Sequence, residues 1–257
     1  MKYYTTPAGS YPRLCENILN QPHVLIAGAT GSGKSVLINS LIYTLLYRGP
    51  GQAELVLIDP KRVELVNYSN LPHTIGYSSE TSDIINTITG TVDLMERRYS
   101  EMQKKRIKLY AGPDVYVIID EYADLVTTSK KYTVPNICRI AQLGRAARIH
   151  LIVATQRPTR DIIDGQIKVN IDSRIALRCP TRQDSRNIIN VPGAETLPRY
   201  GHGYYLTPDT MIPILVDIPM TPESELNRLI DHWTRQRPRP GILTKLKNGN
   251  IIKPWRY

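Results

Sequence analysis

Short apolar runs rich in β-branched residues recur along the chain and show no alternation of polar and apolar positions. That pattern is typical of strands buried on both faces of a parallel sheet. Such runs are HVLIAG from His23, ELVLID from Glu54, VYVIID from Val115 and HLIVAT from His150. Further strands are expected at SRIALRC from Ser173, GYYLTP from Gly203 and MIPILVDI from Met211.

Helical periodicity separates these strands. Helices are expected after Lys34 (SVLINSLIYTLLYR), from about Thr81 to Tyr110, from about Val134 to Arg148, and from about Glu223 to Arg235. Strands that alternate with helices of this length form right-handed βαβ units. The pattern therefore predicts an α/β fold in which helices flank a mostly parallel sheet. We expect a lead-in segment (1–21), one α/β domain (22–219) and a short helix with a basic tail (220–257).

The composition is that of a soluble globular protein, with 41% hydrophobic and 22% charged residues. The chain contains no apolar run of 18 residues, and its start lacks the apolar centre of a secretory signal. Cys15, Cys138 and Cys179 are far apart, which favours neither a disulfide framework nor a zinc site. We therefore expect a cytoplasmic protein without membrane insertion.

The net charge of +10 is concentrated near the end of the chain. No acidic residue follows Asp231, and the basic residues after it are Arg235, Arg237, Arg239, Lys245, Lys247, Lys253 and Arg256. A basic tail indicates either a polyanionic partner bound through counterion release or a solvated end that keeps the chain soluble.

The segment GATGSGKS, residues 28–35, matches the phosphate-binding pattern G-x-x-x-x-G-K-[ST] in full, between an expected strand and an expected helix. Its glycines let backbone amides approach phosphates, and the helix presents its positive N-terminus to the same anions. Lys34 is expected to reach the β- and γ-phosphates of ATP, and the Ser35 hydroxyl to bind Mg²⁺. The expected nucleotide contacts are Gly28, Ala29, Thr30, Gly31, Ser32, Gly33, Lys34, Ser35 and Val36.

Two acids follow the apolar run VYVII directly. Asp120 is placed to hold Mg²⁺ through water, and Glu121 to polarise the attacking water as a general base. A nucleotide switch or a small-molecule kinase does not need a carboxylate at the second position, whereas hydrolysis does. The alternative is an ordinary helix N-terminus enriched in acids.

A further expected strand, HLIVAT, ends in Thr155 and Gln156. A glutamine at that edge of the sheet can hydrogen-bond the γ-phosphate or the attacking water and so sense hydrolysis. The alternative is a simple turn before Pro158.

Several blocks together resemble the motor domain of the FtsK/SpoIIIE DNA translocases. They are PHVLIAGATGSGKSV, LIDPKRVEL, NLPH, MERRY, VIIDEYADL, GRAARIHLIVATQRP and IKVNIDSRIALR, in order from Pro22 to about Leu206. The resemblance implies a RecA-like P-loop NTPase that assembles as a homo-oligomeric, hexameric ring around duplex DNA. ATP would bind at subunit interfaces, where one subunit supplies an arginine to the site of the next.

The resemblance also implies roles for basic residues. Arg145 in GRAARIH matches the arginine that acts in the neighbouring site, with Arg148 as the competing candidate and a solvated helix face as the plain alternative. The matching DNA-facing residues are Arg157, Lys168, Arg182 and Arg186. The segment TTSKKYTVP, expected as a loop with Lys130 and Lys131, is a weaker candidate for DNA contact.

The sequence departs from the family in lacking a membrane-spanning region, a long linker and a C-terminal winged-helix domain. These absences favour a translocase of a mobile element, phage or plasmid. The leading hypothesis is an ATP-driven motor on double-stranded DNA. The alternatives are a conjugation coupling or genome-packaging ATPase that moves single-stranded DNA, and an adaptor that uses ATP to hold a protein partner.

Overall fold

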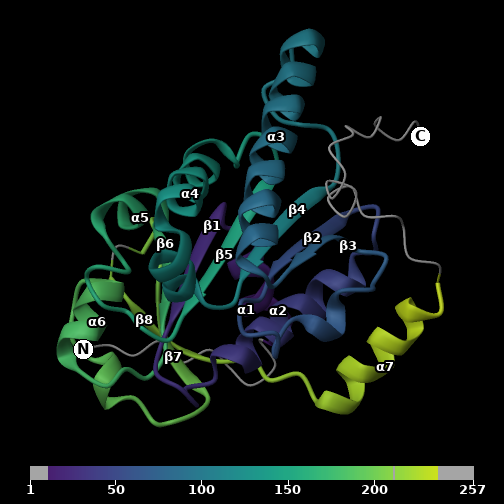
Figure 1. Cartoon of the computed structure of the whole chain (residues 1–257). Helices are drawn as coiled ribbons and strands as arrows, with labels where there is room; N and C mark the ends of the chain where they lie inside the picture. The colour runs from purple at the N-terminus through teal and green to yellow at the C-terminus, as the bar shows by residue number, and fades with distance from the viewer. Residues whose placement is uncertain (1–10, 211, 237–257) are drawn as a thin grey trace.

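The computed structural model describes residues 11–210 and 212–236, and these build one sheet of eight strands (Figure 1). The strand order is β3-β2-β4-β5-β1-β6-β7-β8. The first six strands in this order pair in parallel, while β7 and β8 join the β6 edge antiparallel. The strands are β1 His23–Ala27, β2 Ala53–Ile58, β3 Thr74–Ser78, β4 Asp114–Ile119, β5 Ile149–Thr155, β6 Ser173–Ala176, β7 His202–Leu206 and β8 Ile214–Asp217.

The central strands have no polar face because both faces are covered. In β4, Val115, Val117 and Ile119 belong to one buried cluster, whereas Tyr116 and Ile118 belong to the other. All are at most 2% exposed. Successive side chains of a strand point to opposite faces, so an unbroken apolar run supplies two cores at once.

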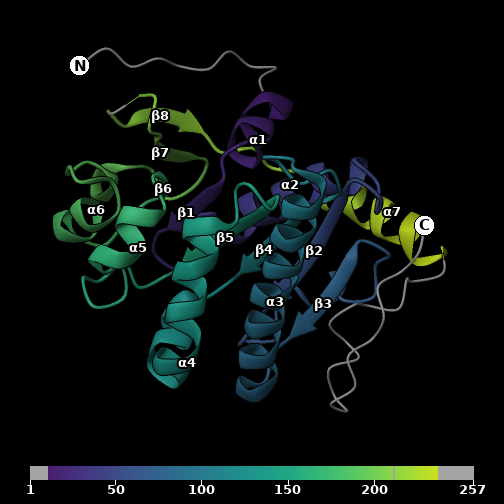
Figure 2. The same ribbon diagram turned by 90° about the horizontal axis from the view of Figure 1, so that it is seen from above.

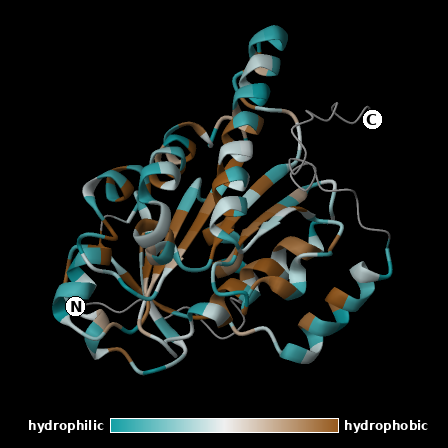
Figure 3. Cartoon of the chain, in the orientation of Figure 1, coloured by the Kyte–Doolittle hydropathy of each residue, from teal (hydrophilic) through white to brown (hydrophobic). Residues whose placement is uncertain are grey.

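Helices form a layer on each face of the sheet (Figure 2). One layer contains α1 Tyr11–Leu19, α2 Lys34–Tyr47 and α7 Glu223–Thr234. The other contains α3 Thr81–Lys105, α4 Tyr122–Leu143 and α5 Gly165–Asn170, with α6 Arg182–Ile189 beside β6. The strands are the most apolar part of the molecule, and the outer end of α3 is hydrophilic (Figure 3).

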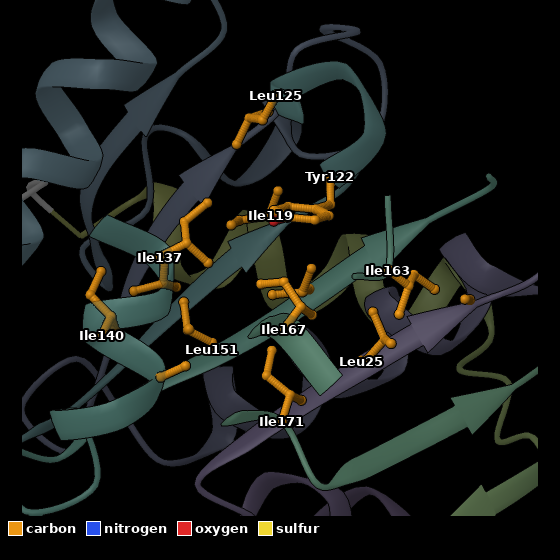
Figure 4. Close-up of a cluster of buried hydrophobic side chains, with 14 of the residues drawn as sticks. Leu25, Ile119, Tyr122, Leu125, Ile137, Ile140, Leu151, Ile163, Ile167 and Ile171 are labelled. Carbon is orange, nitrogen blue, oxygen red and sulfur yellow. The ribbon is translucent and has the colours of Figure 1, made fainter. Parts of the chain in front are cut away.

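The core on the α4 side is drawn in Figure 4. Tyr122 and Ile137 of α4 and Ile167 of α5 lie over Leu25 of β1 and Leu151 of β5, and all five are at most 1% exposed. This packing fixes the start of α4, and therefore the two acids that precede it, against the ends of the central strands. The predicted α/β architecture with a mostly parallel sheet is confirmed.

The helix expected from Val134 to Arg148 is present, but it forms the second part of a longer helix, α4. It begins at Tyr122, immediately after the two acids, and ends at Leu143. The backbone at Ser129 is not helical (φ −145°, ψ 22°), which kinks α4 inside the segment TTSKKYTVP. Three threonines, a serine and a proline in this short segment favour a loop on local propensity. Lys130 and Lys131 therefore lie within α4 and not on the loop that was expected.

Other boundaries also differ from the sequence pattern. The helix expected to reach Tyr110 ends at Lys105, because Arg106 takes a left-handed conformation (φ 55°) that stops it. α1, β3, α5 and α6 were not predicted. α7 confirms the last expected helix, and its Leu226 packs into the core. The basic tail beyond Arg235 and Gln236 lies outside the described residues.

Candidate nucleotide site

The loop between β1 and α2 is shaped by two of its glycines. Gly28 lies so close to its neighbours that a Cβ there would fall 2.7 Å from Leu177 Cβ. Gly33 has φ 98° and precedes α2 directly, a conformation that favours glycine. No side chain caps α2, so the free amides of its first turn face the loop as donors for an anion.

Lys34 is the first residue of α2 and lies at the centre of the site. Its Nζ donates to Asp120 Oδ1 at 2.5 Å and to the Asp120 carbonyl oxygen at 2.7 Å. Lys34 is 4% exposed and Asp120 is 1% exposed, so this ion pair is shielded from water. β1 and β4 flank β5, and their carboxyl ends place both residues at the same edge of the sheet.

The two residues expected to bind Mg²⁺ lie at this edge, and their chemistry fits the ion. The Ser35 hydroxyl donates to Glu64 Oε1 at 2.8 Å. Asp120 Oδ2 is buried and has no hydrogen-bond partner among the described residues, so it is available to an ion. Hydroxyl and carboxylate oxygens are the ligands that Mg²⁺ prefers. Ser35 and Asp120 would hold it.

The surroundings of Asp120 shift the pKa of its carboxyl group. Burial raises its pKa, and Glu64 and Asp59 raise it further, while Lys34 acts in the opposite direction; the net shift is upward. Burial and the two nearby acids therefore disfavour the ionised form of Asp120, and an added cation would stabilise it.

Glu121 is held by three donors. Its Oε1 accepts from Thr155 Oγ1 at 2.6 Å and from the Gln156 amide at 3.1 Å, and its Oε2 contacts Lys61 Nζ at 3.0 Å. Burial raises the pKa of Glu121, but the hydrogen bonds from Thr155 and Lys61 and the charge of Lys61 outweigh it, so the pKa lies below its usual value. Glu121 is thus kept ionised, the state that a general base needs.

Lys61→Met is expected to shift the acid limb of the pH profile of kcat to higher pH by about half a unit to one unit. The reason is that Lys61 lowers the pKa of Glu121, and the base must be ionised to act; with Lys61 removed, protonation begins at higher pH. The shift is modest because the Lys61 side chain is 40% exposed. Steady-state ATP hydrolysis from about pH 3.5 to about pH 8 measures it, because the limb of the parent chain lies below the usual pKa of a glutamate. Lys61→Arg keeps the charge and should keep the limb in place; an unmoved limb in Lys61→Met would contradict the role.

Gln156 connects Glu121 to the loop of residues 28–35. Its amide donates to Glu121, and its side-chain Oε1 accepts from Thr30 Oγ1 at 2.7 Å. The structure thus brings the expected sensor to the loop, at a bend directly after β5. Its role in sensing the γ-phosphate stays a prediction.

Arg145 and Arg148 differ in what surrounds them. Arg148 donates through Nε and Nη2 to the two carboxylate oxygens of Asp114, at 2.8 and 2.9 Å. Arg145 is exposed in the turn between α4 and β5 and lies beyond the helix, not on its face. Because β5 runs from this turn toward the phosphate loop, Arg145 is at the opposite edge of the sheet from its own Lys34. Any contact of Arg145 with a nucleotide site is therefore with the site of another copy.

The four candidate DNA contacts lie around α5, α6 and the segment after β5. Arg157, Arg182 and Arg186 are exposed, and Lys168 is half-buried. Asn187 of α6 donates to the Pro158 carbonyl at 2.8 Å and so joins the segment after β5 to α6. Arg182 Nε lies 3.4 Å from Glu195 Oε1, and the Arg182 side chain is nevertheless 76% exposed. This region contains basic groups that solvent reaches.

Sequence reasoning missed Lys61, Glu64 and Asp59 as members of the site. They belong to the segment DPKRVEL, which follows β2 just as Asp120 and Glu121 follow β4. Polar residues directly after a second parallel strand were the available signal, because the carboxyl ends of such strands share one edge.

Within residues 11–210 and 212–236, no helix combines the length and the apolar character needed to cross a membrane.

Comparison with known proteins gives one consistent family. The model of the FtsK/SpoIIIE family matches residues 11–114 and 108–160. The DNA translocase FtsK of Helicobacter pylori (strain J99 / ATCC 700824) is 39% identical over 231 residues, which cover 84% of this chain and 27% of that protein. FtsK of Tropheryma whipplei (strain TW08/27) is 38% identical over 258 residues, covering 91% of this chain and 35% of the relative. The chain thus spans about a third or less of these relatives.

Solved structures share the fold. The pCW3 conjugation coupling protein TcpA, in its monomer form with ATPγS, matches with a TM-score of 0.73 and 23% identity, over 84% of this chain and 66% of TcpA. The cytoplasmic domain of the Thermomonospora curvata type VII secretion ATPase EccC matches with a TM-score of 0.71 and 24% identity, over 85% of this chain and 29% of EccC. These likenesses show that the chain shares the fold of these proteins.

Proposed function

Because the chain belongs to the FtsK/SpoIIIE family, we propose that it is the motor part of a translocase that uses ATP hydrolysis to move double-stranded DNA. The observation that carries the proposal is the gathering of Lys34, Asp120, Glu121 and Gln156 at one edge of the sheet, next to the loop of residues 28–35. An adaptor that only holds ATP needs no general base, and here Glu121 is ionised and held in place.

In the proposed reaction, the loop amides and Lys34 bind the phosphates, and their positive charge stabilises the charge that develops on the transferred phosphoryl group. Magnesium, when bound between Ser35 and Asp120, supplies further positive charge at the phosphates. Glu121 accepts a proton from the attacking water, and Gln156 orients that water from the end of β5. Lys61 and Thr155 keep the Glu121 carboxylate in one position.

DNA is the proposed track because relatives at 38–39% identity are DNA translocases and because basic groups surround α6. Arg157, Lys168, Arg182 and Arg186 would contact phosphates, which position a duplex without reading its sequence. The proposed assembly is a ring of identical subunits with the cytoplasm as its compartment. In such a ring Arg145, at the edge opposite Lys34, reaches the site of the next subunit.

Duplex DNA is expected to stimulate ATP hydrolysis by this chain about tenfold, and the stimulation should fall steeply as salt is raised, because phosphate contacts release counterions. The measurement is steady-state turnover with linear duplex and with circular single strands across a salt series. The double variant Arg157→Gln/Arg182→Gln should lose most of the stimulation. It should also lower the slope of log apparent DNA affinity against log salt concentration by about two.

The matched control is Arg139→Gln, since Arg139 is an exposed arginine on α4 that pairs with Glu96 at 2.8 Å, away from α6. It should keep the stimulation of the parent chain. Turnover that ignores every form of DNA would remove the motor proposal, and stimulation by single strands alone would replace it with a single-strand motor of the coupling or packaging kind.

A further inference from the structure

The segment Asp59–Leu65 after β2 folds back over the phosphate loop. Asp59 Oδ2 accepts from the Leu65 amide at 3.0 Å, which closes the segment into a short loop. This closure places Glu64 against the first turn of α2, where its Oε1 accepts from the Ser35 hydroxyl. A residue far from Ser35 in sequence is therefore fixed on the hydroxyl expected to bind magnesium.

Asp59 also lies beside Asp120. β2 and β4 pair in parallel with Ile58 opposite Ile119, so the next residue of each strand continues at the same edge. The Asp120 amide donates to the Ile58 carbonyl at 3.1 Å, which fixes this register. Asp59 and Asp120 are 0% and 1% exposed, and Glu64 is half-buried.

The described residues leave two carboxylate oxygens of this group without a hydrogen-bond partner. They are Asp59 Oδ1 and Asp120 Oδ2, both buried. A buried carboxylate oxygen without a donor or a cation costs free energy, and three neighbouring acids repel one another. Lys34 contacts only Asp120 Oδ1 of this set. The arrangement is one that a divalent cation would complete.

We propose that Glu64 is a positioning residue of the magnesium site, with Asp59 holding the segment that carries it; this rests on the proposed ATPase function. Glu64 accepts the hydrogen bond that the Ser35 hydroxyl donates, so the lone pairs of the Ser35 oxygen would be free for the ion. Its negative charge also adds to the attraction for a cation. Partners of this kind behind a ligand set metal affinity, typically by 10–100-fold.

The test measures the affinity for a fluorescent, non-hydrolysable ATP analogue in EDTA and in excess Mg²⁺, and takes the ratio of the two dissociation constants. This ratio reports how strongly metal and nucleotide support each other's binding, without any need for turnover. Glu64→Ala is expected to lower the ratio about 10–100-fold. Its affinity in EDTA should stay within about twofold of the parent chain. The ratio for Glu64→Gln should lie between the ratios of Glu64→Ala and the parent chain, because glutamine keeps an acceptor for Ser35 but loses the charge.

The matched control is Glu80→Gln, because Glu80 is an exposed acid that pairs with Arg62 of the same segment. It should leave the ratio unchanged. A Glu64→Ala ratio within twofold of the parent would overturn the inference, as would an equal loss of affinity in EDTA and in Mg²⁺, which indicates a purely structural role. If Glu64→Ala does not fold, the Glu64→Gln ratio decides by the same criterion. A parent chain that binds no nucleotide at all would instead overturn the proposed function.

Discussion

A Lys34→Ala chain is expected to hydrolyse ATP at least about 10³-fold more slowly than the parent, with or without DNA. Lys34 is the buried cation of the phosphate loop, and removing it takes away charge where the reaction concentrates negative charge. The change also leaves Asp120 buried without its ion-pair partner, a loss that costs about 3–5 kcal/mol when the charge stays. Asp120 would take up a proton instead, since its pKa is already raised.

Steady-state turnover and thermal unfolding should be measured together, because a chain that unfolds also loses activity. Lys105→Ala is the matched control, since Lys105 is exposed at the end of α3 and pairs only weakly with Glu101. It should keep the turnover and the melting temperature of the parent. Turnover close to the parent rate in a folded Lys34→Ala chain would place the chemistry elsewhere.

A mixture of Arg145→Ala and Glu121→Gln chains is expected to hydrolyse ATP faster than the average of the two preparations. Each variant alone should lose about 10³-fold or more, the first through its arginine and the second through its base. In a mixed ring with head-to-tail contacts, about a quarter of the interfaces join an intact Glu121 to an intact Arg145 from the next subunit. Those interfaces restore activity.

The mixing experiment is read as turnover against mixing ratio at constant total protein. A curve with its maximum near equal amounts supports shared sites, and a straight line contradicts them. In the control mixture, Arg139→Ala takes the place of Arg145→Ala. This variant removes an exposed arginine of α4 that forms an ion pair within its own chain. Arg148→Ala should not behave like Arg145→Ala, since the Arg148 guanidinium is held on Asp114.

The parts of this fold that could be predicted depend on local sequence. β1, β4 and β5 are unbroken apolar runs, and Lys34, Asp120 and Glu121 occupy fixed positions relative to a strand end. The start of the helix that contains Val134 was predicted too late, because the residues that follow the kink at Ser129 are helical although their local propensity favours a loop.

The rest of the site depends on contacts between residues far apart in sequence. Glu64 meets Ser35 across 29 positions, and Lys61 meets Glu121 across 60. Arg148 meets Asp114 across 34 positions, so sequence spacing could not reveal this pairing. Strand order brings these residues together, and no short pattern encodes it.

In the proposed motor, the end of β5 joins the proposed catalytic base directly to the proposed DNA contacts. Thr155 donates its hydroxyl to Glu121, and the same oxygen accepts from the amide of Arg157, the first residue proposed to touch DNA. A movement of the Glu121 carboxylate on loss of phosphate would thus be transmitted to Arg157 through the Thr155 side chain alone. A motor built this way needs no long lever arm: its step would be generated and delivered within three consecutive residues.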